Sequence, residues 1–80
     1  MNLYRISQEV NTDPDTYDAA IVAAAYADEA RKIHPRGDAS AWEGVWGTWA
    51  ADPKDVDVEL IGTAKPGTEA GVILASFNAG

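Results

Sequence analysis

The chain has 80 residues, 46% of them hydrophobic, and it contains no cysteine. A chain of this length has room for one small domain, residues 1–80, built from a single sheet and one or two helices, and apolar burial must stabilise it because no disulfide can form. Its 13 acidic and 6 basic side chains give a net charge of −7, which repels phosphate and disfavours direct binding to nucleic acid.

The first residues of the chain and its longest apolar run indicate where in the cell the protein is located. The first residues lead directly into an alternating pattern, without a charged segment followed by an apolar one, so we expect no signal peptide. The longest nearly uncharged run, residues 19–27, is much shorter than the roughly 20 residues that cross a bilayer. The sequence therefore predicts a cytoplasmic protein with no membrane span.

Two strands are expected in the first third of the chain. Residues 3–10 alternate in polarity and place Tyr4, Ile6 and Val10 on one face, which predicts a half-buried strand. A turn rich in Asn and Asp follows. Residues 17–24 form a continuous apolar run, which predicts a second strand buried on both faces, although the helical propensity of its alanines favours a helix as the alternative.

A short helix is expected over residues 26–33. Acidic side chains stand in its first turn and basic ones in its last, as the helix dipole favours, and Pro35 ends it. A helix of two turns is unstable alone, so it must dock on the sheet. The side chains expected to make this contact are Tyr26, Ala30 and Ile33.

The second half of the chain predicts a loop and two more strands. Residues 36–55 contain glycines and a proline, which favour an ordered loop or an irregular strand. Residues 55–64 alternate and predict a third strand, and residues 71–78 predict a fourth, apolar enough on both faces for a central position. The apolar side chains on one face of the third strand are Val56, Val58 and Leu60. This order predicts an α+β fold, a small single-layer, mostly antiparallel sheet of about four strands with one short helix packed on one face.

No pattern in the sequence indicates catalysis. Asn11, Asp13 and Asp15 alternate like the start of a calcium loop, but Thr16 stands where such a loop needs glycine, so a solvated turn is the better interpretation. His34 is the only histidine, and we interpret it as a positively charged cap of the helix C-terminus. We expect no enzymatic activity, no catalytic residue, and no bound metal or cofactor.

Three tryptophans within eight residues are the most informative feature. Trp42, Trp46 and Trp49 supply far more apolar area than a loop usually carries. Either they fold over the open face of the sheet and complete a small core, or at least one stays exposed and anchors a partner. In the second case acidic neighbours such as Glu43 form a polar rim that attracts a basic partner. The candidate partner-binding residues are Trp42, Trp46, Trp49 and Glu43.

Four stretches of the chain also carry a family resemblance. They read MNLYRISQEVN at residues 1–11, TYDAAIVAA at 16–24, EARKIHP at 29–35 and GVILASFNAG at 71–80. Together they resemble a family of short, uncharacterised proteins encoded by tailed phages and prophages. The resemblance implies an intracellular protein made during infection or from a prophage, and small accessory proteins of this kind often act by binding.

Two functional hypotheses follow. The first is a phage-type accessory protein that binds a host or phage protein and modulates a host factor or host defence. The second is an acidic decoy that mimics nucleic acid and inhibits a host DNA- or RNA-binding protein. The net charge of −7 is the observation that supports this hypothesis. A homodimer is a further option, because a small sheet has exposed edge strands.

Overall fold

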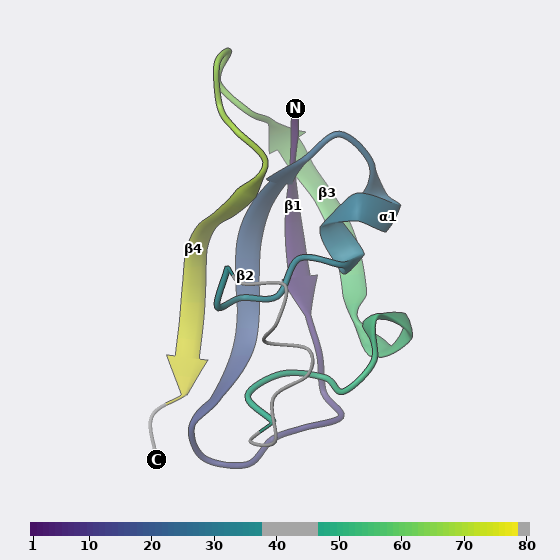
Figure 1. The fold of residues 1–80 in the computed structure, drawn as a ribbon, viewed down its shortest axis with the longest axis vertical. Coiled ribbons are helices and arrows are strands. Elements are labelled where there is room, and N and C mark those ends of the chain that lie inside the picture. Colours follow the sequence, from purple (N-terminus) through teal and green to yellow (C-terminus); the bar gives the residue numbers. More distant parts are fainter. Residues whose placement is uncertain (38–46, 79–80) are drawn as a thin grey trace.

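The computed structural model describes residues 1–37 and 47–78 (Figure 1). Its elements are β1 (Asn2–Ser7), β2 (Thr16–Ala24), α1 (Ala27–Arg31), the 3-10 turn η2 (Pro53–Asp55), β3 (Asp57–Thr63) and β4 (Gly71–Asn78). The four strands form one sheet in the order β3-β1-β2-β4, and each neighbouring pair is antiparallel. The predicted α+β fold, a four-stranded antiparallel sheet with one short helix, is confirmed.

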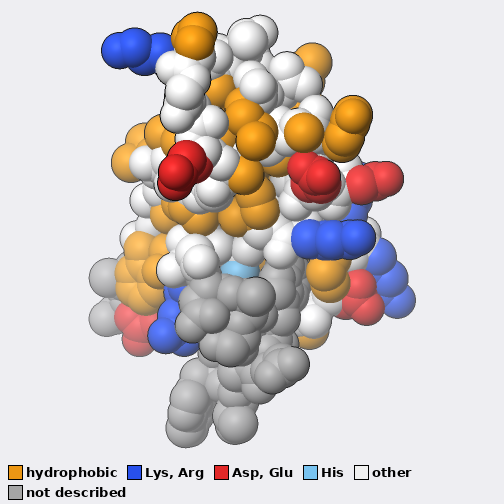
Figure 2. Space-filling model, turned by 45° about the horizontal axis from the view of Figure 1, so that its top comes forward, with side chains coloured by type: hydrophobic (Ala, Val, Ile, Leu, Met, Phe, Trp, Pro, Cys, Tyr) orange, Lys and Arg blue, Asp and Glu red, His pale blue; other side chains and the backbone are white. Residues whose placement is uncertain are grey.

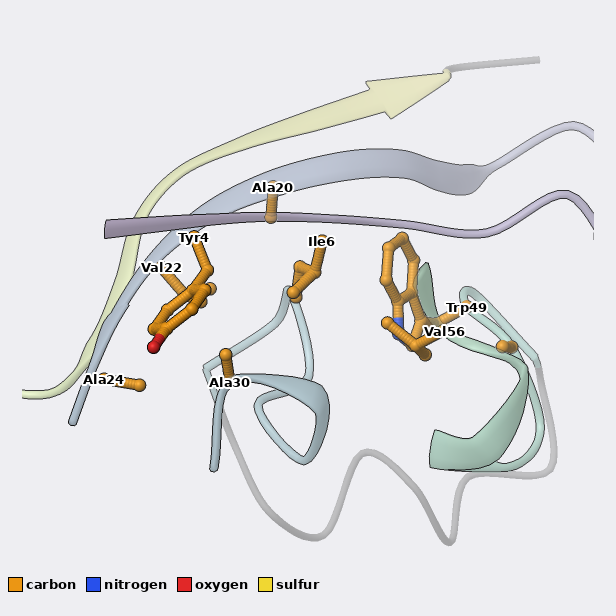
Figure 3. Packing of buried hydrophobic residues seen from close by; sticks show 9 residues of the cluster. Tyr4, Ile6, Ala20, Val22, Ala24, Ala30, Trp49 and Val56 are labelled. Carbon is orange, nitrogen blue, oxygen red and sulfur yellow. The ribbon is translucent and has the colours of Figure 1, made fainter. Parts of the chain in front are cut away.

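The fold has two layers. The sheet is one layer, and α1, η2 and the chain around Trp49 lie together on one of its faces, where the core forms (Figure 3). The strands place alternate side chains in this core, as a period of two requires. The buried core side chains are Tyr4, Ile6, Ala20, Val22, Ala24, Ala30, Trp49, Ala50 and Val56. We call this side of the sheet the covered face and the opposite side the open face.

Strand β1 ends three residues earlier than the sequence pattern predicts. Gln8 is only 5% exposed, and its side-chain Nε2 donates to the carbonyls of Asn11, at 2.7 Å, and Tyr17, at 3.1 Å. Its Oε1 accepts from the backbone N–H of Asn11 at 2.7 Å. These bonds turn the chain away from the strand direction, so Val10 lies in the turn and is 63% exposed. The prediction that Val10 shares the buried face of β1 is wrong.

Helix α1 is shorter than predicted and docks differently. Ala30 is fully buried and Ile33 packs partly against the core, as expected. Tyr26, in contrast, is 69% exposed, because it is the extended residue before the first turn and not part of the helix (φ −139°, ψ 157°). The predicted contact of Tyr26 is therefore wrong. Arg31 supplies another attachment, since its guanidinium donates to the carbonyl of Val56 at 2.7 Å.

Strand β4 is an edge strand, and the prediction of a central position is wrong. The chain returns from α1 to place β3 beside β1 and β4 beside β2, so the two later strands take the two edges (Figure 1). The same topology exposes apolar side chains of both edge strands. In β3, Val58 is partly buried opposite Ile6, whereas Leu60, opposite Tyr4 on the same face, is 61% exposed.

Candidate interaction surface

Of the predicted anchors, the structure describes only Trp49. Its side chain is 2% exposed and lies under the sheet beside Val56 (Figure 3). The side-chain amide of Asn11 donates to the carbonyls of Gly47, at 3.1 Å, and Trp49, at 3.2 Å, and so ties this segment to the turn after β1. Trp49 therefore completes the core and presents no surface to a partner in this fold. The other three candidates, Trp42, Trp46 and Glu43, lie outside the described residues.

His34 belongs to the same core region and is not the predicted helix cap. The C-terminal cap of α1 is Lys32, and His34 is 4% exposed, with its ring 6.4 Å from the ring of Tyr17 and 6.5 Å from that of Trp49. Its Nδ1 accepts from the backbone N–H of Arg36 at 3.1 Å. Burial, together with the positive charge of Arg36, lowers the pKa of His34 below 6.5. The neutral ring is favoured, so the prediction of a positively charged cap is wrong.

The turn between β1 and β2 is held by its own side chains. Asn11 Oδ1 accepts from the N–H of Asp13 at 3.3 Å, and the Thr16 hydroxyl donates to the Asp13 carbonyl at 2.6 Å. Asp15 adopts a left-handed conformation with φ of 63°, which aspartate tolerates better than most residues. In the part of the chain that the structure describes, no three His, Cys, Asp or Glu side chains are grouped so as to hold a metal ion.

The open face carries a row of side chains that crosses three strands. Arg5 of β1 pairs with Ile21 of β2, and Ile21 pairs with Leu74 of β4, so all three point to the same side. They border a shallow hollow of about 530 Å³. Its other lining residues include Asp18, Ala19 and Ser76. The hollow thus combines an apolar floor with one basic, one acidic and one hydroxyl side chain.

Large apolar side chains of β4 stand exposed along this edge of the sheet, and Leu74 among them lines the hollow. Leu74 is 68% exposed, Ile73 is 52% exposed and Phe77 is 47% exposed. The pairing of β2 with β4 shifts register between Ile21 and Val22, which leaves Ile73 as an extra residue without a cross-strand partner in β2. Phe77 packs edge-on against Tyr17, with ring centroids 4.8 Å apart. We call the hollow and the exposed apolar side chains at this edge the β4 surface: Ile21 and Leu74 on the open face, the bulge residue Ile73, and Phe77 on the covered face.

The sequence contains part of the signal for this surface. Residues 71–78 are apolar on both faces and uncharged, a composition that is typical of a central strand. The same composition is also found in edge strands whose exposed apolar side binds another chain. Only the strand order distinguishes the two cases, and a single sequence does not reveal it.

Charges lie at both ends of β4. The backbone N–H of Asp15 donates to the carbonyl of Asn78 at 2.7 Å, which places Asp15 beside the end of the strand. Asp18 is exposed and is the extra residue of β2 where the pairing moves from Phe77 to Ser76. Lys65 and Glu69 lie in the connection that precedes β4. One end of the strand is therefore acidic and the other end is mixed.

Comparisons with known proteins do not identify the chain. No protein family model, no curated protein and no solved structure matches it. Within the described ranges, no helix has the length and hydrophobicity needed to span a membrane.

Proposed function

We propose that the chain is a small accessory protein, of the phage and prophage type, that acts in the host cytoplasm by binding another protein. The observation that supports this proposal is the β4 surface, where three large apolar side chains of one edge strand are about half exposed or more and one of them, Leu74, lines a shallow hollow. Contiguous exposed apolar area on a small protein is typical of an interaction site. The partner is a host or phage protein whose activity is changed by the contact.

Binding fits the chemistry of this surface better than catalysis does. The hollow is open and holds single side chains of each polar type, so it brings no acid and base together around an enclosed substrate. His34, the only histidine of the chain, is buried on the covered face, on the other side of the sheet from the hollow. We therefore propose a non-enzymatic role that needs no cofactor. A contribution from Trp42, Trp46 and Glu43 to partner binding stays a prediction.

The alternative is an acidic decoy that occupies the nucleic-acid channel of a host protein. The charge of −7 favours it, as do Asp57 and Glu59, which lie two residues apart on the open face of β3. Against it, Arg5 lies directly opposite Glu59 on that face. The acidic side chains visible in Figure 2 also stand in separate groups with basic side chains among them, and do not form one stripe. The decoy is the weaker proposal.

Affinity capture from a bacterial lysate tests the proposal. The wild-type chain is used as bait at low and at high salt, beside a bait with Ile73→Ser and Leu74→Ser, which removes apolar side chains from β4. A matched control bait carries Leu60→Ser and Ile61→Ser, which are similarly exposed, at 61% and 46%, on the opposite edge strand. We expect the wild-type bait to capture a partner that stays bound at high salt. The bait with Ile73→Ser and Leu74→Ser should not capture this partner, and the control bait should.

Other outcomes discriminate between the proposals. A nucleic-acid-binding protein that is captured at low salt and released as the salt concentration rises supports the decoy, because screening weakens an electrostatic contact. The absence of any specific partner under both conditions contradicts the binding function.

A further inference from the structure

We propose that the partner binds by adding a strand to the outer edge of β4, and that this strand is rich in β-branched residues and uncharged except for one lysine or arginine at the end near Asp15 and Asp18. The inference rests on the proposed function and specifies the chemistry of the segment that the β4 surface takes. In this mode main-chain hydrogen bonds supply affinity, and alternate side chains supply specificity.

The outer edge of β4 has no strand partner in the sheet that the described residues form, where β4 pairs with β2 alone. Edge strands usually avoid further pairing through a lysine, a proline, an inward charge or a bulge. The eight residues 71–78 contain no lysine, proline or charged side chain, and the bulge at Ile73 leaves residues 74–78 as a regular strand. A strand of eight residues is about 27 Å long, and its outer side presents alternate N–H and C=O groups to an incoming chain.

The side chains along this edge determine what the added strand should carry. Every second side chain of an added strand points to the open face, next to Leu74 and Ser76 at the rim of the hollow. Apolar or β-branched side chains at these positions cover Leu74, which is 68% exposed. The side chains that point the other way meet the exposed edge of Phe77, which shares the covered face with Tyr17.

The charges favour a basic residue at one end of the added strand. Asp15 is held beside the end of β4 by its bond to the Asn78 carbonyl, and Asp18 is exposed one strand away. A lysine or arginine placed there gains from the exposed carboxylate of Asp18, and the net charge of −7 steers a basic segment toward the chain.

A second copy of the chain fits this edge poorly. Two β4 strands paired antiparallel would bring Asp15 and Asp18 of one copy toward the connection before β4 of the other. Glu69, two residues from the strand, is the nearest charged residue there in the sequence, and Lys65 is four residues further away, so carboxylates would approach each other. An edge contact about 27 Å long and about 10 Å wide covers roughly 300 Å² on each partner, which suits a short linear segment but is well below the about 800 Å² of a standard stable interface between two folded chains. A short segment of another protein has no such repulsion.

Selection from a library of random peptides, long enough to pair with all of β4, tests the inference on the full chain. We expect the recovered peptides to be rich in β-branched residues with a basic residue at one end, and to shift the amide resonances of Gly71–Asn78. Leu74→Lys should weaken their binding at least about tenfold. Leu60→Lys, which alters a similarly exposed leucine on the other edge, should leave it unchanged. Asp18→Asn should weaken it severalfold and reduce its salt dependence.

A change in the peptide provides a readout that does not depend on folding of a variant. N-methylation of alternate amides removes either the set of donors that faces β4 or the set that faces solvent. If the peptide adds as a strand, methylation of the amides that face β4 should abolish binding, and methylation of the amides that face solvent should leave binding nearly intact. Equal effects of the two sets, or peptides that bind wild type and Leu74→Lys alike, overturn the inference.

The failure of the inference and the failure of the proposed function have different signatures. Peptides or captured proteins that shift amides only outside β4 leave the binding function in place and overturn strand addition. A dimer in sedimentation analysis that dissociates in Leu74→Lys also overturns it, because the edge is then filled by a second copy. If neither the peptide library nor the lysate yields a ligand, both proposals fail.

Discussion

Trp49 occupies the part of the core that a five-residue helix leaves uncovered. α1 covers the sheet near Tyr4 and Val22, and Trp49 with Val56 fills the space near Ile6 (Figure 3). The indole Nε1 finds no acceptor among the described residues, so the side chain acts through its apolar area and its shape. Its role in a chain without disulfides is to enlarge a core that is otherwise rich in alanine.

Replacing Trp49 should therefore affect stability. We expect Trp49→Ala to lower the free energy of unfolding by about 3–5 kcal/mol, because a large cavity forms, and this is a large part of the total for a domain of this size. Trp49→Phe keeps an aromatic ring and should lose less. Urea denaturation measures both changes. An alanine variant as stable as wild type but unable to bind a partner would show that Trp49 is an anchor.

His34 makes stability depend on pH. Its pKa is lowered in the folded protein, so the unfolded chain, with a pKa near 6.5, binds the proton more tightly. The stabilisation is complete above about pH 6.5 and is lost as the pH falls through the lowered pKa of the folded state.

A variant separates this effect from the titration of carboxylates. His34→Asn keeps an acceptor for the N–H of Arg36 but does not titrate. Thermal unfolding measured from neutral to mildly acidic pH should show a larger drop in the wild-type midpoint than in the variant midpoint. Equal drops would contradict a neutral, buried His34.

At the scale of elements, the sequence predicts which segments form strands and where β2 and β4 end, but it places the end of β1 three residues too late. The range of β4 was predicted correctly, and that of β2 to within one residue, because β-branched and apolar runs bounded by turns are local signals. The end of β1 was missed because Gln8 bonds to Asn11 and Tyr17, and Tyr17 lies nine positions further along the chain. The start of α1 was missed because Tyr26 fits the helical pattern yet has an extended backbone.

The turn after β1 can be tested through Gln8. Gln8→Met has a similar volume and removes three hydrogen bonds, so we expect a loss of about 1–3 kcal/mol in unfolding free energy, measured by urea denaturation. Val10→Ser is the matched control in the same turn and should change stability by less than about 0.5 kcal/mol, since Val10 is exposed. The opposite order of effects would mean that β1 continues to Val10.

At the scale of the whole molecule, strand order decides which apolar residues are core and which are surface. The sequence predicts the fold class, the covered positions Tyr4 and Ile6, and the buried Ala30. It does not predict the β4 surface, because whether residues 71–78 lie at the centre or the edge depends on pairing with β2, some fifty residues earlier in the chain. Long-range pairing of this kind leaves no local signature.

Hydrogen–deuterium exchange of the full chain, alone and with a partner recovered by capture, tests the central claim most directly. A partner that binds the β4 surface should slow exchange in Gly71–Asn78 and leave exchange in Ala27–Arg31, on the covered face, unchanged. Protection confined to α1, with β4 exchanging as in the free protein, would contradict the claim that a partner binds the β4 surface.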